Sequence, residues 1–130
     1  GIQVEIQQVE QTTFFRDLHR RRFQMFVSGW IADYVDPESF LKIKFHSESP
    51  QNDQGYSNPE VDRLLEQADV EQNQEARLAL YRQVEERLVQ DAVWVPVFYG
   101  RAHWLVKPYV KGFEPPAIVI PWLRYVSLER

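Results

Sequence analysis

The sequence contains no cysteine, and this absence removes several kinds of chemistry at once. A chain without cysteine has no disulfide framework, no thiolate metal site and no cysteine nucleophile. No apolar run approaches the roughly 18 residues that a membrane-spanning helix needs. Cations are not in excess either, because the formal net charge is -4. The overall charge therefore gives no reason to expect nucleic acid or an anionic membrane as a partner.

The usual sequence signatures of enzymes and metal sites are also missing. The histidines His19, His46 and His103 fall in separate predicted elements, and none has a second ligand type one helical turn away. This spacing excludes zinc chemistry of the HExxH kind. There is no GxSxG turn and no glycine-rich phosphate loop. We therefore expect no metal, no cofactor and no enzymatic activity.

What is present is the composition of an ordinary globular domain, or of a piece of a larger one. The chain has 130 residues, of which 44% are hydrophobic and 26% charged. A chain of this length can bury a real core. It opens on a strand-like pattern at Gly1-Ile2 with no leader and no initiating Met, and we expect it to be cut from a longer chain.

The first third of the chain has the pattern of a strand, a helix and a second strand. Apolar and polar residues alternate over 2–7, which predicts a strand with one wet face. Thr12 and Thr13 can cap a short helix that ends in a basic cluster at 16–22. The dense apolar run 23–30 is typical of a strand buried on both faces. Together these segments predict a βαβ unit.

Three more helices are predicted. Asp36-Pro37-Glu38 starts one, and 57–60 starts the next, which has an apolar face made of Val61, Leu64, Leu65 and Ala68. Gln72-Asn73 separates it from a longer helix, in which apolar residues recur every four positions at Ala76, Leu80, Val84 and Leu88. Further strands are predicted at 94–99, 102–110 and 123–128, the last at the end of an irregular arm. The predicted fold class is α/β, with a mainly parallel sheet flanked by helices and a C-terminal arm.

The basic cluster at 16–22 allows two interpretations. It could grip phosphates, or it could be a solvated helix C-terminus where cations oppose the helix dipole. The acidic total charge favours the second interpretation.

Asp33 also has two interpretations from the residues alone. Asp33, Asp36 and Glu38 crowd together, and paired carboxylates could hydrolyse glycosides, but a helix start already explains Asp36 and Glu38. Asp33 follows a buried strand at its carboxyl end, where open α/β sheets bind ligands. It could equally be a turn or capping residue, which the residues alone favour.

Four blocks carry a resemblance to a known family. They are GWIADYVDPESFL (29–41), GYSNPEVDRLLEQA (55–68), ARLALYRQVEERLVQDAVWVPVFY (76–99) and VKPYVKGF (106–113). In order and spacing they resemble the peptide/oligopeptide substrate-binding proteins of ABC transporters, bacterial solute-binding protein family 5. The resemblance covers nearly all of the chain.

The resemblance implies part of a two-lobed, periplasmic-binding-protein-like fold that closes on its ligand. Residues 1–101 are expected to belong to the second, C-terminal ligand-binding lobe. Residues 102–130 are expected to form the hinge strand and the segment that returns to the first lobe. That first lobe is then a partner missing from this chain. The arm from Leu105 onward is expected either to fold back or to pair with another copy.

The resemblance also implies the binding residues. Asp33 stands where relatives pair a carboxylate with the ligand's free α-amino group. Gly29, Trp30 and Ile31 stand where relatives hydrogen-bond the peptide main chain, and Trp30 also lines a side-chain pocket. The chain departs from some relatives at Val27, where they carry a cation that can meet the peptide carboxylate.

The implied function is that of a periplasmic protein or an extracellular lipoprotein that captures oligopeptides or dipeptides for a membrane permease. No covalent chemistry and no nucleic acid are involved. Two other classes stay open. One is a ligand-sensing domain fused to a transcriptional regulator, and the other is a hydrolase that uses Asp33 and Asp36.

Overall fold

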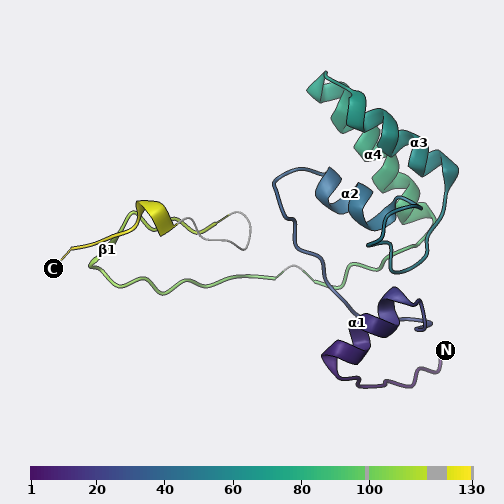
Figure 1. Ribbon diagram of the computed structural model, residues 1–130, viewed down its shortest axis with the longest axis horizontal. Helices are drawn as coiled ribbons and strands as arrows, with labels where there is room; N and C mark the ends of the chain where they lie inside the picture. The colour runs from purple at the N-terminus through teal and green to yellow at the C-terminus, as the bar shows by residue number, and fades with distance from the viewer. Residues whose placement is uncertain (99, 117–122, 130) are drawn as a thin grey trace.

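The computed structural model describes residues 1–98, 100–116 and 123–129. Its elements are α1 (Gln11–His19), α2 (Glu38–Phe45), α3 (Pro59–Val70), α4 (Gln74–Gln90), β1 (Val110–Lys111), the 3-10 turn η1 (Leu123–Tyr125) and β2 (Ser127–Leu128). Helices α2, α3 and α4 form one cluster, α1 lies below it, and the arm that carries β1 extends away from the helices (Figure 1).

The helices begin where local capping chemistry predicts. The side chain of Asn58 accepts a hydrogen bond from Glu60 N at 3.0 Å, with Pro59 in the first turn of α3. Asn73 accepts from Ala76 N at 3.0 Å and starts α4 in the same way. These contacts satisfy backbone donors that a helix N-terminus otherwise leaves unpaired. The predicted start of α3 and the predicted break at Gln72-Asn73 are confirmed.

The cap of α1 differs from the prediction. The carboxylate of Glu10 accepts from Thr12 N at 2.9 Å and from Thr13 N at 3.0 Å. The two threonines therefore lie inside the first turn as donors and do not cap it. The negative charge of Glu10 also lies at the positive end of the helix dipole, where it stabilises α1. The hydrogen bonds from these two amides lower the pKa of the Glu10 carboxyl.

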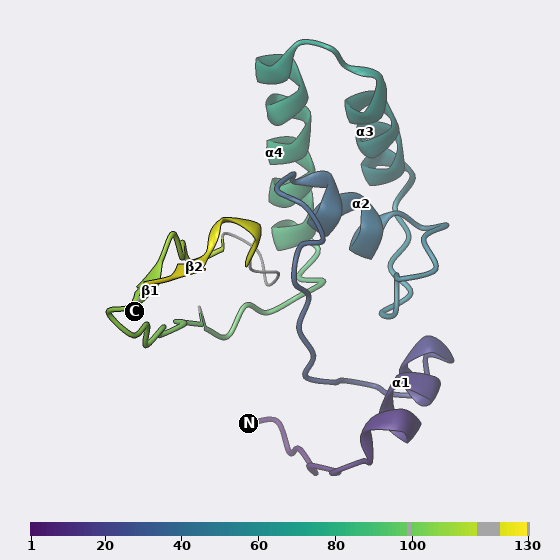
Figure 2. The same ribbon diagram turned by 60° about the vertical axis from the view of Figure 1, so that its left-hand side comes forward.

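The hydrophobic core lies between α2, α3 and α4, and the last two run side by side as a hairpin (Figure 2). The predicted buried face of α3 is confirmed. In α4 the buried face passes through Tyr81, Val84 and Leu88, whereas Ala76 is exposed and Leu80 only partly buried. The buried residues of this core are Leu41, Phe45, Val61, Leu64, Leu65, Ala68, Tyr81, Val84 and Leu88.

The predicted mainly parallel sheet is not found among the described residues. Among the described residues the only strands are β1 and β2, which pair antiparallel through Val110 with Leu128 and Lys111 with Ser127. The segments 2–7, 23–30, 94–98 and 102–109 form no ladder, so the βαβ unit and the mainly parallel sheet are not found here. Tyr99, the end of one predicted strand, and 117–122 of the arm lie outside the described residues.

The reason is that a strand needs a partner, and alternation alone does not supply one. Ile2 and Ile6 are 89% and 91% exposed, although their pattern is that of a half-buried strand. No backbone hydrogen bond joins residues 1–9 to another described residue. Separately, no helix in the described ranges is both long and apolar enough to cross a bilayer.

Helix α1 is joined to the rest through its C-terminal end. Leu18 is buried, and Arg21 Nη2 donates to the carbonyl of Asn52 at 3.3 Å. Gly55, at φ +68°, lies beside this contact, because an added Cβ would come within 3.1 Å of Arg21 Cδ. Arg16 and Arg22 both pair with Asp17. The partner of these two arginines is local, as expected of a solvated helix end, whereas Arg21 of the same basic cluster bonds to Asn52.

Candidate functional site

The predicted ligand residues lie on one stretch of chain between α1 and α2. Residues 26–32 have no regular structure, and a bend at 33–36 leads into α2. Gly29, Ile31 and Asp33 are exposed, while Trp30 is half-buried. The structure thus places all four predicted residues on one irregular segment, with Gly29, Ile31 and Asp33 exposed.

Ser39, in the first turn of α2, forms hydrogen bonds to both Trp30 and Asp33 of this stretch. Its side chain is fully buried, and its Oγ accepts a hydrogen bond from Asp33 N at 3.0 Å. Its backbone carbonyl accepts from Trp30 Nε1 at 2.6 Å. One buried residue therefore fixes both the backbone beside the Asp33 carboxylate and the edge of the Trp30 ring.

A buried ion pair lies against the Trp30 ring. Lys44 Nζ is 4.9 Å from the ring centroid, which is cation–π distance. The same ammonium lies 2.8 Å from Asp53 Oδ2, and both side chains are only 7% exposed. His19 Nδ1 lies 2.8 Å from the other oxygen of Asp53. The carboxylate of Asp53 thus joins α1, α2 and the loop before α3 beneath the site.

The bend after Asp33 is fixed to α4. Arg77 Nη1 and Nη2 reach the two carboxylate oxygens of Asp36 at 2.7 and 2.8 Å, a bidentate pair. Asp36 Oδ1 also accepts from Glu38 N, the first residue of α2, at 2.9 Å, although the N-cap position itself is Pro37 and not Asp36 as predicted. The hydrogen bonds from Arg77 hold the pKa of the Asp36 carboxyl below its usual value.

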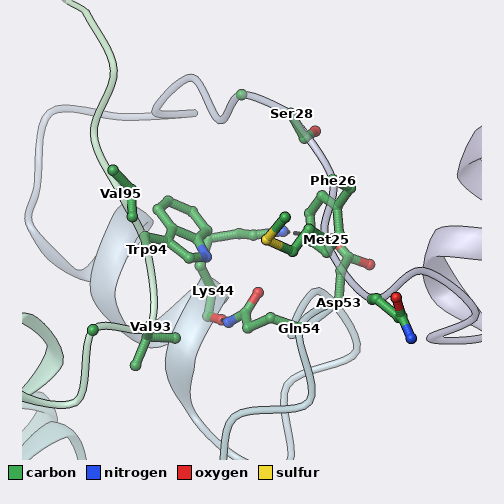
Figure 3. A pocket seen from close by; sticks show the side chains of 12 residues that line it. Met25, Phe26, Ser28, Lys44, Asp53, Gln54, Val93, Trp94 and Val95 are labelled. Atoms are coloured by element: carbon green, nitrogen blue, oxygen red, sulfur yellow. Dashed lines mark hydrogen bonds and ion pairs between the residues drawn. The ribbon is translucent and has the colours of Figure 1, made fainter. Parts of the chain in front are cut away.

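A cavity of about 360 Å³ opens beside Gly29 (Figure 3). A Cβ added at Gly29 would meet nothing within 4 Å, so the main chain here faces open space. In Figure 3 the cavity is bordered by Trp94 and Val95 on one side and by Met25 and Phe26 on the other. Its lining is Gln24, Met25, Phe26, Ser28, Gly29, Lys44, Asp53, Gln54, Ala92, Val93, Trp94 and Val95.

A second hollow of about 580 Å³ is lined by residues that follow Gly29 along the stretch and by residues of α2 and α4. Its wall is mostly apolar and includes Trp30 and Ile31. Residues 29–31 therefore border both hollows, Gly29 the first and Trp30 and Ile31 the second. Apolar walls with few polar groups are usual for ligand sites. The full lining is Trp30, Ile31, Ala32, Tyr34, Val35, Asp36, Pro37, Phe40, Leu41 and Glu85.

The Asp33 carboxylate and the Asp36 carboxylate differ in what they can do. Within the described residues, no hydrogen bond or ion pair engages the Asp33 side chain, so it is available to an external cation. Asp36 is bound by Arg77 and by Glu38 N, and its lowered pKa keeps it ionised. A general acid must carry a proton, so Asp36 does not suit the acid role of a carboxylate hydrolase.

Sequence reasoning missed three residues of this arrangement: Ser39, Lys44 and Arg77. One signal was available, because Lys44 falls at helical spacing on the same face as the buried Leu41 and Phe45. For Ser39 and Arg77 no local pattern exists. Across the part of the chain that the structure describes, no group of three or more His, Cys, Asp or Glu side chains could hold a metal ion.

Comparisons with known proteins find relatives over most of the chain. The chain is 36% identical over 113 residues to the dipeptide-binding protein DppE of Bacillus subtilis (strain 168), covering 86% of this chain and 20% of that protein. It is 34% identical over 113 residues to the periplasmic oligopeptide-binding protein OppA of Escherichia coli (strain K12), covering 87% and 21%. No family model matches the chain.

A solved structure is similar as well. The periplasmic murein tripeptide-binding protein MppA, in its unliganded open form, superposes with a TM-score of 0.72 and 30% sequence identity, covering 82% of this chain and 20% of that one. The chain is homologous to a segment of the family 5 peptide-binding proteins.

The homologous segment is a small share of each family 5 relative. The chain spans about a fifth of the length of the curated relatives that it matches, 20% of DppE and 21% of OppA. The MppA similarity shows that the chain has the fold of part of a periplasmic binding protein, although most of its own regular structure is helical.

Proposed function

We propose that this chain is part of the ligand-binding component of an ABC importer, which captures peptides outside the cytoplasmic membrane and passes them to a membrane permease. The observation that carries the proposal is the 36% and 34% identity, over most of the chain, to proteins named for binding dipeptides and oligopeptides. The protein acts by reversible binding and catalyses no reaction. Its compartment is the periplasm, or the cell exterior as a lipoprotein.

Within this proposal Asp33 binds the α-amino group of the peptide. A buried ammonium needs a carboxylate partner to offset its lost hydration. The Asp33 side chain is exposed, engages no other described residue, and stands on a backbone that Ser39 fixes. These three features support the assignment.

Gly29, Trp30 and Ile31 bind the peptide main chain in the manner of an added strand. Such pairing gives affinity that depends little on the peptide's sequence. The open space beside Gly29 and the absence of helix or strand pairing over 26–32 support this role. The Trp30 ring, held at its edge and on one face, lines a pocket for a peptide side chain.

Residues 1–101 belong to the second lobe, and 102–130 form the hinge strand and the segment returning to the first lobe. In the whole protein the segments 2–7, 23–30 and 94–98 become strands of a mainly parallel sheet, flanked by α2, α3 and α4. Exposed apolar side chains on unpaired backbone, such as Ile2 and Ile6, support this part of the proposal.

The test compares trialanine with N-acetyl-trialanine by calorimetric titration of the intact protein that carries this chain. We expect Asp33→Asn to weaken trialanine binding by about 2–5 kcal/mol, because the ammonium is left without a charged partner. Binding of the acetylated peptide should change little. The matched control is Glu75→Gln, which makes the same charge change at an exposed position of α4. Equal affinity of Asp33→Asn and wild type for trialanine would remove Asp33 from the site.

A further inference from the structure

Arg77 lies far from the ligand stretch in sequence but is joined directly to it in space. It is in the first turns of α4 and is 41 residues from Asp36, yet it binds both carboxylate oxygens of Asp36 at 2.7 and 2.8 Å. Asp36 belongs to the same bend as Asp33, whose side chain is proposed to hold the peptide amino group. Arg77 itself does not border either hollow.

The guanidinium is held rigidly from the side of the helical cluster. Its Nε donates to the carbonyl of Ala68 at 3.2 Å, and its Nη2 donates to the hydroxyl of Tyr81 at 2.9 Å. The guanidinium carbon also lies 4.9 Å from the Tyr81 ring centroid. Arg77 therefore has contacts on α3, on α4 and on the bend. Because a planar guanidinium with this many partners has a fixed orientation, the Asp36 carboxylate that it binds is held in a fixed position relative to the hydrophobic core.

Asp36 is joined to Asp33 through the short bend at 33–36. Asp36 Oδ1 accepts from Glu38 N at 2.9 Å, and Asp36 N donates to Tyr34 O at 2.9 Å. The bend is thus fixed at its far end by Arg77 and at its near end by the bond from Asp33 N to Ser39 Oγ. With one end released, the Asp33 backbone would sample more conformations.

We infer that Arg77 is a positioning residue for the peptide amino group, because its pairing with Asp36 holds the 33–36 bend where the Asp33 carboxylate can meet that group. The inference rests on the proposed function. A preset carboxylate spares the ligand the cost of ordering the bend, and this gain is made only with ligands that carry the ammonium. Loss of the Arg77–Asp36 pair should therefore weaken the binding of peptides with a free amino group more than the binding of acetylated peptides.

A merely structural role makes a different prediction. If Arg77 only stabilised the helical cluster, its replacement would lower the free energy of unfolding and weaken all peptides alike. The ratio of the two dissociation constants, N-acetyl-trialanine over trialanine, would not change. That ratio therefore separates the two roles.

The test measures this ratio in the intact protein that carries the chain, for wild type, Arg77→Lys and Arg82→Lys. Arg77→Lys keeps the charge but loses the bidentate geometry. Arg82→Lys is the matched control on an exposed position of the same helix. We expect Arg77→Lys to reduce the ratio about tenfold, within the range that residues outside a site exert on it. Arg82→Lys should leave it unchanged. An unchanged ratio in Arg77→Lys, or an equal loss for both peptides, would overturn the inference.

A second readout needs no ligand. Hydrogen exchange of the Asp33 amide should be faster in Arg77→Lys than in wild type, while the amide of Leu65 in the core keeps its rate. Unchanged exchange at Asp33 would also overturn the inference. If Arg77→Lys does not fold, Asp36→Asn replaces it, because the amide oxygen can still accept from Glu38 N. A wild-type protein that does not distinguish the two peptides refutes the proposed recognition of the peptide amino group by Asp33, and the exchange rates then test only whether Arg77 holds the 33–36 bend. A wild-type protein that binds neither peptide refutes the proposed function.

Discussion

The buried hydroxyl of Ser39 accepts a hydrogen bond from the backbone N–H of Asp33 at 3.0 Å. This bond joins the first turn of α2 to the residue proposed to bind the peptide amino group. Because the Ser39 carbonyl also accepts from Trp30 Nε1, one helix turn sets the geometry of both ends of the stretch. Ser39 is therefore the simplest place to disturb the site without touching a ligand-binding group.

Ser39→Ala should loosen the Asp33 backbone and leave Trp30 in place. The substitution removes the Oγ acceptor but keeps the carbonyl that binds the indole. We expect a loss of about 1 kcal/mol in the free energy of unfolding, the usual value of one hydrogen bond. The measurement is urea unfolding, with the Asp33 amide shift in NMR as the local readout. Ser57→Ala, at an exposed position, is the control. An unmoved Asp33 amide would contradict this account.

Lys44→Met should be among the most damaging single changes in the helical cluster. It leaves the carboxylate of Asp53 buried, with only the imidazole of His19 beside it. Removing one partner of a buried pair costs about 3–5 kcal/mol. The control is Lys42→Met on the same helix, whose partner Asp69 is far more exposed, and which should cost no more than about 1 kcal/mol. Thermal unfolding of the two variants measures the difference, and equal losses would refute it.

The Arg77–Asp36 pair predicts a specific dependence of stability on pH. The pKa of Asp36 is lower in the folded chain than its ordinary value of 3.8. A depressed folded pKa contributes stability that is fully present above the unfolded pKa and is lost as the pH falls through the folded pKa. The stability difference between wild type and Arg77→Met should therefore be constant from pH 7 to about pH 5 and shrink below about pH 4.

Urea unfolding at a series of pH values measures that difference. Other carboxyls, including those of Asp17 and Asp91, also have lowered pKa values, so the total stability alone does not isolate Asp36. Subtracting the Arg77→Met curve removes their common contribution. Arg82→Met, on the exposed face of the same helix, should give a difference from wild type that does not vary with pH. A pH-independent difference for Arg77→Met would contradict the assignment.

What sequence could predict follows from the range over which each signal acts. The starts of α3 and α4 were predictable because Asn58 and Asn73 cap donors within three residues. The strands were not, because the alternation at 2–7 describes side chains and leaves the partner of the backbone unspecified. Within the described residues no backbone group pairs with 2–7, and its apolar side chains stay exposed.

The site shows the same division. Gly29, Trp30, Ile31 and Asp33 are consecutive or nearly so, and a family motif of that length can be recognised in one sequence. The residues that position them, Ser39, Lys44 and Arg77, are dispersed along the chain. Arg77 pairs with Asp36 across 41 positions, and no local sequence pattern predicts this contact. Contacts of this kind become visible only when the helices are packed together.

The exposed N-terminal segment gives the last prediction, which is that the 130-residue chain self-associates. Ile2, Val4 and Ile6 alternate with polar residues, are 60% or more exposed, and lie on backbone without bonds to other described residues. An unpaired edge of this kind pairs readily with another chain.

We expect the molar mass from light scattering to rise with concentration, and Ile2→Lys/Ile6→Lys to remain monomeric because charge on an edge opposes pairing. Val89→Lys, at an exposed position of α4 whose backbone is already helical, should associate like wild type. A wild-type chain that is monomeric at every concentration would refute the prediction, and association of Ile2→Lys/Ile6→Lys equal to that of wild type would move the contact to another surface.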